Sequence, residues 1–351
     1  MKKFRIISAI LAASVLFSAT AFADFSDMPS DEGTKIAIEN AVSNGLLSGY
    51  EDGTVRPDAS ITRAEMAVII TRACGVDKEA DISEFSDVPA DAWYHSAFAK
   101  AYQMGAFSGD DQKQMHPTNN ITFQECFTIL SQVFDLLPEY TIANDEPTEA
   151  LPAGYLYVGG RTPRIYNIGV LNSYADGADV ADWAKIYFAG VVANGGWTGE
   201  NGYLTPTAHI TRGQFAIVMN NLIQNYIDTP GTYTELPTGN TMIRCDGVVL
   251  DSVVSDSSLY ISDGVSPFGV TFEETVTDGK IAINRLVVRG CATALGEDGK
   301  PVNEEYGISP KGSYNAIRIL RPYIAANLSD SAYKGLYAAP GTSVVLGYIS
   351  N

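Results

Sequence analysis

Residues 49–65 read GYEDGTVRPDASITRAE, and this stretch decides how the first half of the chain folds. Its glycine-rich turn leads to Pro57, and Ile61 follows four residues later. Thr62 is a preferred helix N-cap, and Glu65 stands three residues after it, where its side chain can reach back to the N-cap amide. The stretch therefore predicts a turn, a short extended segment and a helix that begins after Thr62.

The same unit occurs three times along the chain. The later copies repeat the proline-to-isoleucine spacing and the cap pair at Pro117, Ile121, Thr122 and Glu125 and at Pro206, Ile210, Thr211 and Gln214. An apolar pattern of helical period precedes each copy, and it ends in a G-x-x-x-G at Gly45 to Gly49, Gly105 to Gly109 and Gly195 to Gly199. A helix–turn–helix unit of about 50 residues cannot bury both helices alone, so three copies packed on one another are expected.

These copies resemble the S-layer homology (SLH) domain. The match is fullest in the first copy, which has Phe25–Ser26–Asp27 at its start and the stretch 49–65 in its middle. The second copy has Phe123 where the family has arginine, and the third has a loop one residue shorter. The resemblance covers residues 24–78, 84–137 and 172–227 and leaves residues 138–171 as an insertion.

The resemblance implies a fold and a ligand. In this family three repeats form an all-α pseudo-threefold trimer of helix–loop–helix units, whose grooves bind secondary cell-wall polysaccharide, often pyruvylated. The residues it implicates in polysaccharide binding are Arg63, Arg212, Trp93, Trp183, Gly49, Gly109 and Gly199. An arginine at a helix N-terminus offers a fork of donors, with backbone N–H groups nearby, for the carboxylate of a pyruvate ketal.

The same residues also have structural interpretations. Arg63 and Arg212 could instead form salt bridges between adjacent repeats. Trp93 and Trp183 could pack in the core as readily as they could stack on a sugar. Phe123 in place of arginine suggests that one of the three grooves is degenerate.

The chain begins with the features of an exported protein. Residues 1–23 combine basic residues, an apolar run from Ile6 to Phe17, and small side chains at Ala21 and Ala23, which indicates a secretory signal peptide. No later apolar run is long enough for a transmembrane segment. A net charge of −18 disfavours nucleic acid as a partner. We expect a secreted protein of the cell wall or S-layer, associated with peptidoglycan and capable of self-assembly.

In the last third of the chain the apolar residues recur with a different period. Residues 228–239 are polar with two prolines and predict a linker. Apolar triplets then begin at Val248, Leu259, Val270 and Ile281, each 11 residues after the last, so residues 240–351 predict an all-β domain. The segment resembles the short parallel β-solenoids attached to some SLH proteins, and a β-sandwich or small barrel is almost equally compatible. Gly, Pro and Tyr after residue 290 are typical of loops and short strands.

The sequence gives little support for catalysis. All three histidines precede residue 228, and no recognised catalytic motif, metal-ligand pattern or cofactor motif is present. We therefore expect a non-enzyme that displays its β domain or contributes to the S-layer. The alternatives are a wall-anchored glycan-active enzyme with the β domain as its catalytic unit, and an adhesin or carbohydrate-binding module.

Four cysteines accompany the export signal. Cys74 and Cys126 lie in apolar helical patterns and predict buried free thiols. Cys245 and Cys291 bracket one β-rich stretch, where a disulfide and two free thiols are equally compatible with the sequence.

Overall fold

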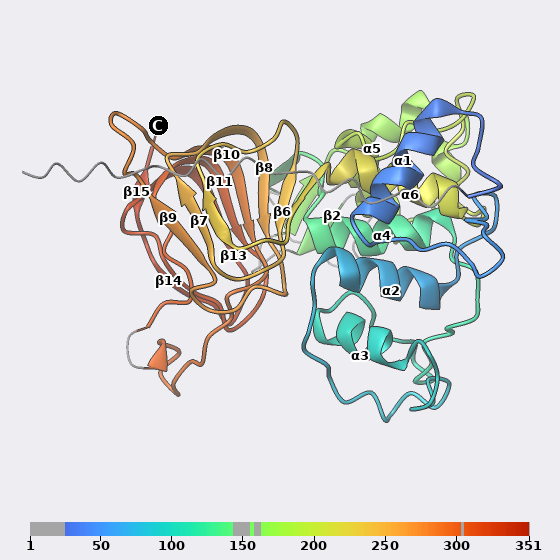
Figure 1. Cartoon of the computed structure of the whole chain (residues 1–351), viewed down its shortest axis with the longest axis horizontal. Helices are drawn as coiled ribbons and strands as arrows, with labels where there is room; N and C mark the ends of the chain where they lie inside the picture. The colour runs from blue at the N-terminus through green and yellow to red at the C-terminus, as the bar shows by residue number, and fades with distance from the viewer. Residues whose placement is uncertain (1–24, 143–154, 158–162, 303–304, 351) are drawn as a thin grey trace, which may run out of the picture.

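The structure, a computed structural model, describes residues 25–142, 155–157, 163–302 and 305–350. The predicted signal peptide lies outside these residues. Figure 1 shows two parts side by side: helices built by the first two-thirds of the chain, and long parallel sheets built by the last third. None of the helices in the described part of the chain is both long and apolar enough to span a membrane.

Among the described residues of the first part are six α-helices, two from each copy of the repeated unit. They are α1 (Glu32–Ser43), α2 (Arg63–Ala73), α3 (His95–Gln103), α4 (Phe123–Phe134), α5 (Lys185–Ala193) and α6 (Arg212–Leu222). The three predicted capping boxes are confirmed at the starts of α2, α4 and α6. The glycines just beyond the first helices, Gly45, Gly105 and Gly195, have positive φ, a conformation that glycine adopts readily at the end of a helix.

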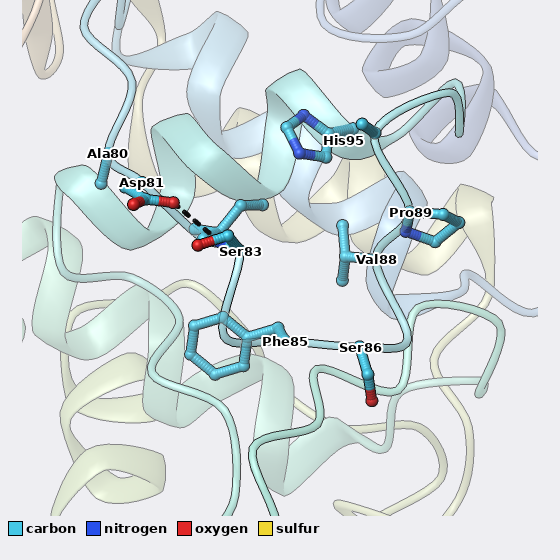
Figure 2. Close-up of a pocket in the computed structure, with 10 residues that line it drawn as sticks. Ala80, Asp81, Ser83, Phe85, Ser86, Val88, Pro89 and His95 are labelled. Carbon is cyan, nitrogen blue, oxygen red and sulfur yellow. Dashed lines mark hydrogen bonds between the residues drawn. The ribbon is translucent and has the colours of Figure 1, made fainter.

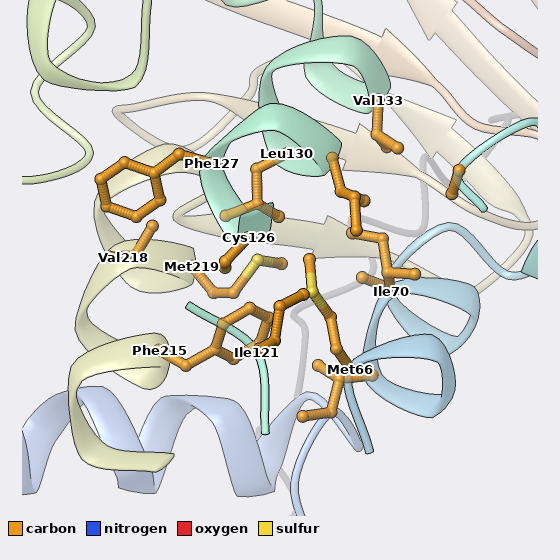
Figure 3. Close-up of a cluster of buried hydrophobic side chains, with 14 of the residues drawn as sticks. Met66, Ile70, Ile121, Cys126, Phe127, Leu130, Val133, Phe215, Val218 and Met219 are labelled. Atoms are coloured by element: carbon orange, nitrogen blue, oxygen red, sulfur yellow. The ribbon is translucent and has the colours of Figure 1, made fainter. Parts of the chain in front are cut away.

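The second helices of the three copies share one core. Figure 3 shows side chains from α2, α4 and α6 converging, among them Met66, Phe127 and Phe215, each fully buried. The extended residues ahead of these helices close a ring of backbone hydrogen bonds. Ile61 donates to Ile210, Ile210 to Ile121, and Ile121 to Ile61, over distances of 3.0, 3.1 and 3.0 Å. Each copy is therefore bonded to both of the others.

The insertion forms a small antiparallel sheet. Its strands are β1 (Tyr140–Ile142), β2 (Tyr155–Tyr157) and β3 (Pro163–Tyr166), in the order β1-β3-β2. The remaining residues between 143 and 162 lie outside the described part. Two 3₁₀ turns, η1 (Gly169–Ser173) and η2 (Gly177–Asp179), lead from this sheet to α5.

The last third of the chain is built from parallel strands. The seven-stranded sheet runs, in spatial order, β15 (Tyr348–Ile349), β13 (Ser331–Ala338), β11 (Gly312–Ile319), β10 (Ala282–Val288), β8 (Val254–Ile261), β6 (Thr241–Ile243) and β4 (Asn225–Ile227). A second sheet holds β5 (Gly231–Tyr233), β7 (Val248–Asp251) and β9 (Val270–Glu273), and a third pairs β12 (Ala325–Asn327) with β14 (Ser343–Val345). From β4 to β10 the chain visits the first two sheets in turn. The apolar side chains between the sheets form a separate core.

The apolar triplets are confirmed as strands, but two expectations about this region were wrong. The sheet starts at β4, ahead of the expected linker, and β5 lies inside it, because residues 228–239 connect two strands rather than two domains. The second concerns the residues after Cys291, where loops and short strands were expected. The strands β12, β14 and β15 are short, but β11 and β13, eight residues each, extend the parallel sheet, because their backbones pair in register with the strand before them.

Arginines join the sheet to the helices. All five arginines after residue 240 reach the C-terminal ends of helices or the residues just beyond them. They are Arg244, bonded to the carbonyls of Asn44 and Arg72; Arg285 and Arg318, bonded to Asp135; Arg289, bonded to the carbonyls of Met104 and Val133; and Arg321, bonded to the carbonyl of Gln103. A cation at a helix C-terminus satisfies carbonyls that lack an intrahelical partner and complements the helix dipole.

The cysteines are all free thiols in the structure. Cys74 and Cys126 are buried, as predicted, and burial raises the pKa of Cys74 to about 12. Cys245 is partly exposed and Cys291 is buried, and no disulfide joins them.

Candidate functional site

Three equivalent junctions form where the start of a second helix meets the loop of a neighbouring copy. Arg212 occupies the first junction, between α6 and the loop that contains Gly49. Its side chain donates from Nε to the Val55 carbonyl at 2.8 Å and from Nη2 to the Ser48 carbonyl at 2.9 Å. Nη1 lies 3.3 Å from the Glu65 carboxylate, and the residue is 5% exposed. Every nitrogen of this guanidinium therefore has a partner within the protein.

Arg63 occupies the second junction, between α2 and the loop that contains Gly109. Nε donates to the Met115 carbonyl at 2.8 Å, and the guanidinium lies 5.2 Å from the centre of the Phe107 ring. Its Nη1 is 4.0 Å from the Glu125 carboxylate, too far for a hydrogen bond. Among the described residues, its two terminal nitrogens make no hydrogen bond to the protein, and its side chain is 18% exposed.

Phe123 occupies the third junction, beside the loop that contains Gly199. Its ring lies 5.1 Å from that of Trp197, and both side chains are buried. The aromatic pair fills the place that a guanidinium takes in the other two junctions. This junction therefore offers no cation at the position of Arg63 and Arg212.

Three carboxylates lie near Arg63, but in the described part of the chain none of them accepts a hydrogen bond from its side chain. Burial lowers the pKa of Arg63, and the negative charges of Glu125, Asp87 and Asp110 oppose that effect. Arg63 remains charged at neutral pH because its intrinsic pKa is far higher. The second junction thus combines a charged fork, unused donors and partial exposure.

Backbone amides at the start of α2 are not available to a ligand. Those of Arg63 and Ala64 donate to the carbonyls of Asn119 and Pro117, both at 2.9 Å. That of Glu65 donates to the Thr62 hydroxyl. The expectation that backbone N–H groups would assist the arginine was wrong, because neighbouring copies bond to each other through these amides.

The three glycines of the candidate site have a steric reason to be glycine. A Cβ at Gly49 would overlap the ring of Phe25, and one at Gly109 would overlap the ring of Phe85. At Gly199 the Cβ would meet the Tyr203 carbonyl. Gly109 and Gly199 also have φ of +71°, which disfavours any other residue. These glycines shape the loops that face the junctions.

The two candidate tryptophans lie on the surface. Trp93, just before α3, is 68% exposed, and Trp183, just before α5, is 55% exposed. The interpretation that they pack in the core is therefore wrong: both precede the first turn of a helix whose apolar face points elsewhere. An exposed indole presents an apolar face that a sugar ring can cover.

An aspartate near the start of each copy holds the loop of that copy in place. Asp27 accepts the amides of Val55 and Arg56 at 2.7 and 2.8 Å. Asp87 bonds in the same way to Met115 and His116, and Asp176 to Leu204 and Thr205. The identical offset of 28 and 29 residues in the three copies was the signal that could have revealed this contact.

The junctions lie at the end of the helices that faces away from the sheets. The C-terminal ends of α2, α3 and α4 meet the arginines of the sheet, so their N-terminal ends point the other way, to the right in Figure 1. Arg63 starts α2 and Trp93 precedes α3, and these two helices pack against each other. The junction at Arg63 therefore lies at the end of α2 that is remote from the β-sheets.

A surface pocket of about 310 Å³ lies elsewhere, in the residues that open the second copy. Figure 2 shows its walls, which include Asp81, Phe85, Val88 and His95. None of the candidate arginines or tryptophans is among its lining residues. Within the described ranges, no group of three or more His, Cys, Asp or Glu side chains is placed to hold a metal ion.

Comparisons with known proteins agree with the repeated architecture. The sequence model of the S-layer homology domain matches residues 24–67 and 84–125. A surface-layer 125 kDa protein of Lysinibacillus sphaericus is 32% identical over 228 residues, which is 64% of this chain and 17% of that protein. An amylopullulanase of Thermoanaerobacterium thermosulfurigenes is 26% identical over 61% of this chain and 11% of its own length.

An exoglucanase of Acetivibrio thermocellus is 28% identical over 55% of this chain and 16% of its own length. The chain thus spans less than a fifth of each of these relatives. The first two of the three copies are S-layer homology domains, and similarity to surface-layer proteins accompanies them.

Proposed function

We propose that this chain is an exported cell-surface protein anchored non-covalently to secondary cell-wall polysaccharide through its three repeats. The two S-layer homology matches and the similarity to a surface-layer protein support this function. We include the third copy in the anchor because its backbone closes the ring with the other two and its capping box matches theirs. The three copies then act as one pseudo-threefold unit.

The junction at Arg63 is the principal binding groove in this proposal. The three grooves differ: each nitrogen of Arg212 is bonded within the protein, Phe123 has no charge, and Arg63 retains terminal nitrogens that make no hydrogen bond to the described residues. A ligand at Arg63 gains a charge-assisted hydrogen bond without breaking an existing one. At Arg212 the same ligand would have to displace bonds to two carbonyls.

The ligand that fits is an acidic polysaccharide with an accessible carboxylate, such as a pyruvate ketal. A planar carboxylate matches the paired donors of a guanidinium, whereas a neutral sugar does not require one. Trp93 provides the apolar platform for an adjoining sugar ring. The surrounding acids at Glu125, Asp87 and Asp110 discourage a polymer of high charge density, because like charges repel.

The C-terminal region we interpret as a short β-solenoid that is docked on the anchor and is either displayed by it or used in the S-layer. The parallel pairing and the alternation between sheets support the solenoid over a sandwich. The similarity to an amylopullulanase and an exoglucanase is compatible with the alternative of a wall-anchored enzyme. An adhesin or carbohydrate-binding module is the other alternative. No grouping of residues in the described part favours either alternative over display.

The experiment is a binding isotherm of residues 24–351 on wall sacculi that carry their polysaccharide. Arg63→Ala should weaken binding by roughly 10- to 150-fold, which corresponds to ~1.5–3 kcal/mol for a lost charge-assisted hydrogen bond. Arg72→Ala is the matched control, since it removes the same charge from the exposed last turn of the same helix. Equal affinities for the two variants would contradict the assignment of the groove.

A further inference from the structure

The far end of the seven-stranded sheet is an unpaired, apolar edge. Its outer strand is β15, and among the described residues no strand pairs on its other side. Tyr348 and Ile349 form this strand, and Val345 at the end of β14 and Leu346 lie just before it in the sequence; these four residues are 37% to 77% exposed. We call residues 345–349 the terminal edge.

The backbone of the terminal edge is open to a further strand. The Ser350 amide donates to the Tyr333 carbonyl of β13 at 2.9 Å, and Tyr333 is the register partner of Ile349. In a parallel ladder successive residues turn their polar groups to opposite sides. The amide and carbonyl of Ile349 therefore point away from β13, toward the unoccupied side.

The terminal edge lacks the features that keep other edges from associating. No charged residue occurs between Gly335 and Asn351, although the whole chain carries a net charge of −18. At the opposite end of the sheets, by contrast, the residues around β5 include Asp228, Pro230 and Glu235. Charged side chains and proline are the usual protection of a sheet edge, and an edge without them is expected to be covered.

We propose that a second copy of this chain covers the terminal edge, with the two β15 strands pairing antiparallel about a twofold axis. An edge without charged side chains meets an identical edge without repulsion between side chains, and a twofold contact closes on itself instead of growing into a fibre. Figure 1 places β15 at the end of the molecule opposite the helices, so both helical anchors stay free in the pair. The proposal does not depend on wall binding. If both proposals hold, one particle carries two anchors and gains avidity.

The test is sedimentation velocity of residues 24–351 over a wide range of concentration. The wild-type mass should rise to that of two chains. Ile349→Lys, which places like charges opposite each other, and Ile349→Pro, which removes the outward N–H, should both keep the mass of one chain. Val254→Lys is the matched control, because Val254 is 66% exposed on β8, away from the edge, and this variant should pair as the wild type does.

Hydrogen exchange gives a second readout that does not rely on variants. The Ile349 amide should gain protection as concentration rises, while exposed amides far from the edge should not. A single-chain mass at every concentration would overturn the proposal, as would a pair that survives both Ile349 variants. Species larger than two chains, or loss of pairing in Val254→Lys, would equally overturn it.

Discussion

Arg289 is the residue whose replacement tests most sharply whether sheet and helices form one folding unit. It is 6% exposed, and its guanidinium donates to both oxygens of Asp263 at 2.6 and 3.3 Å. It also donates to the Val133 carbonyl at 3.1 Å and the Met104 carbonyl at 2.9 Å, at the ends of α4 and α3. Arg289→Met keeps much of the side chain's length but leaves this carboxylate and two carbonyls without their donor.

The expected cost follows from burial. Removing one partner of a buried ion pair destabilises a protein by about 3–5 kcal/mol, because the other charge stays buried and uncompensated. Arg321 lies 3.8 Å from Asp263 and relieves part of this penalty, so we place the loss at the lower end, about 3 kcal/mol. The control is Arg56→Met, which breaks the half-exposed pair with Asp52 and should cost ~0–1 kcal/mol.

The assay is urea unfolding followed by two probes. All three tryptophans, Trp93, Trp183 and Trp197, belong to the helical part, so their fluorescence reports on the helices, whereas Arg289 follows β10 directly. Circular dichroism reports on helices and sheets together. We expect Arg289→Met to lower both midpoints by the same amount. The reasoning is refuted if the fluorescence midpoint does not move, or if Arg289→Met costs no more than Arg56→Met.

Three further outcomes follow from the structure. Gly109→Ala should destabilise the chain more than Gly53→Ala, since both have positive φ, with a strain of ~1–2 kcal/mol, but only Gly109 would press a Cβ into Phe85; equal thermal midpoints would contradict this. A thiol reagent should modify Cys245 alone in the native protein and four thiols in urea, because burial protects the other three, and a count of two in urea would reveal a disulfide. Hydrogen bonds from Thr54 lower the pKa of Asp52 to about 2, and the Asp110 pKa is also lowered, chiefly by its bond to His116. A depressed carboxyl pKa stabilises the fold fully above the usual value of 3.8, and this contribution is lost as the pH falls from 3.8 through about 2, so the free energy of unfolding from urea titrations should decrease over that interval; an unchanged value would contradict this.

The helical part was predictable because its signals are local. A threonine cap, its partner three residues later and a glycine at the end of the preceding helix act within one or two turns. The roles of the arginines were not predictable in this way. Arg212 donates to the carbonyls of Val55 and Ser48, which are 157 and 164 residues away in sequence, and nothing near Arg212 distinguishes it from Arg63.

In the C-terminal part the apolar triplets gave the strands but not their partners. Parallel pairing and antiparallel pairing bury the same triplets, so a solenoid and a sandwich could not be separated by period alone. The docking on the helices was missed, although the sequence contained a sign of it. The five arginines of this region contact the helices, while its four lysines form none of these bonds, and arginine is the cation better suited to buried contacts.

Co-sedimentation of residues 24–351 with two preparations of the same sacculi tests directly whether the protein is anchored to wall polysaccharide. One preparation keeps its secondary polysaccharide, and the other is stripped of it while the peptidoglycan stays intact. We expect the protein to pellet with the first preparation and to stay in the supernatant with the second, and free pyruvylated polymer should compete with the first for the protein. Equal pelleting with both preparations would contradict a polysaccharide anchor.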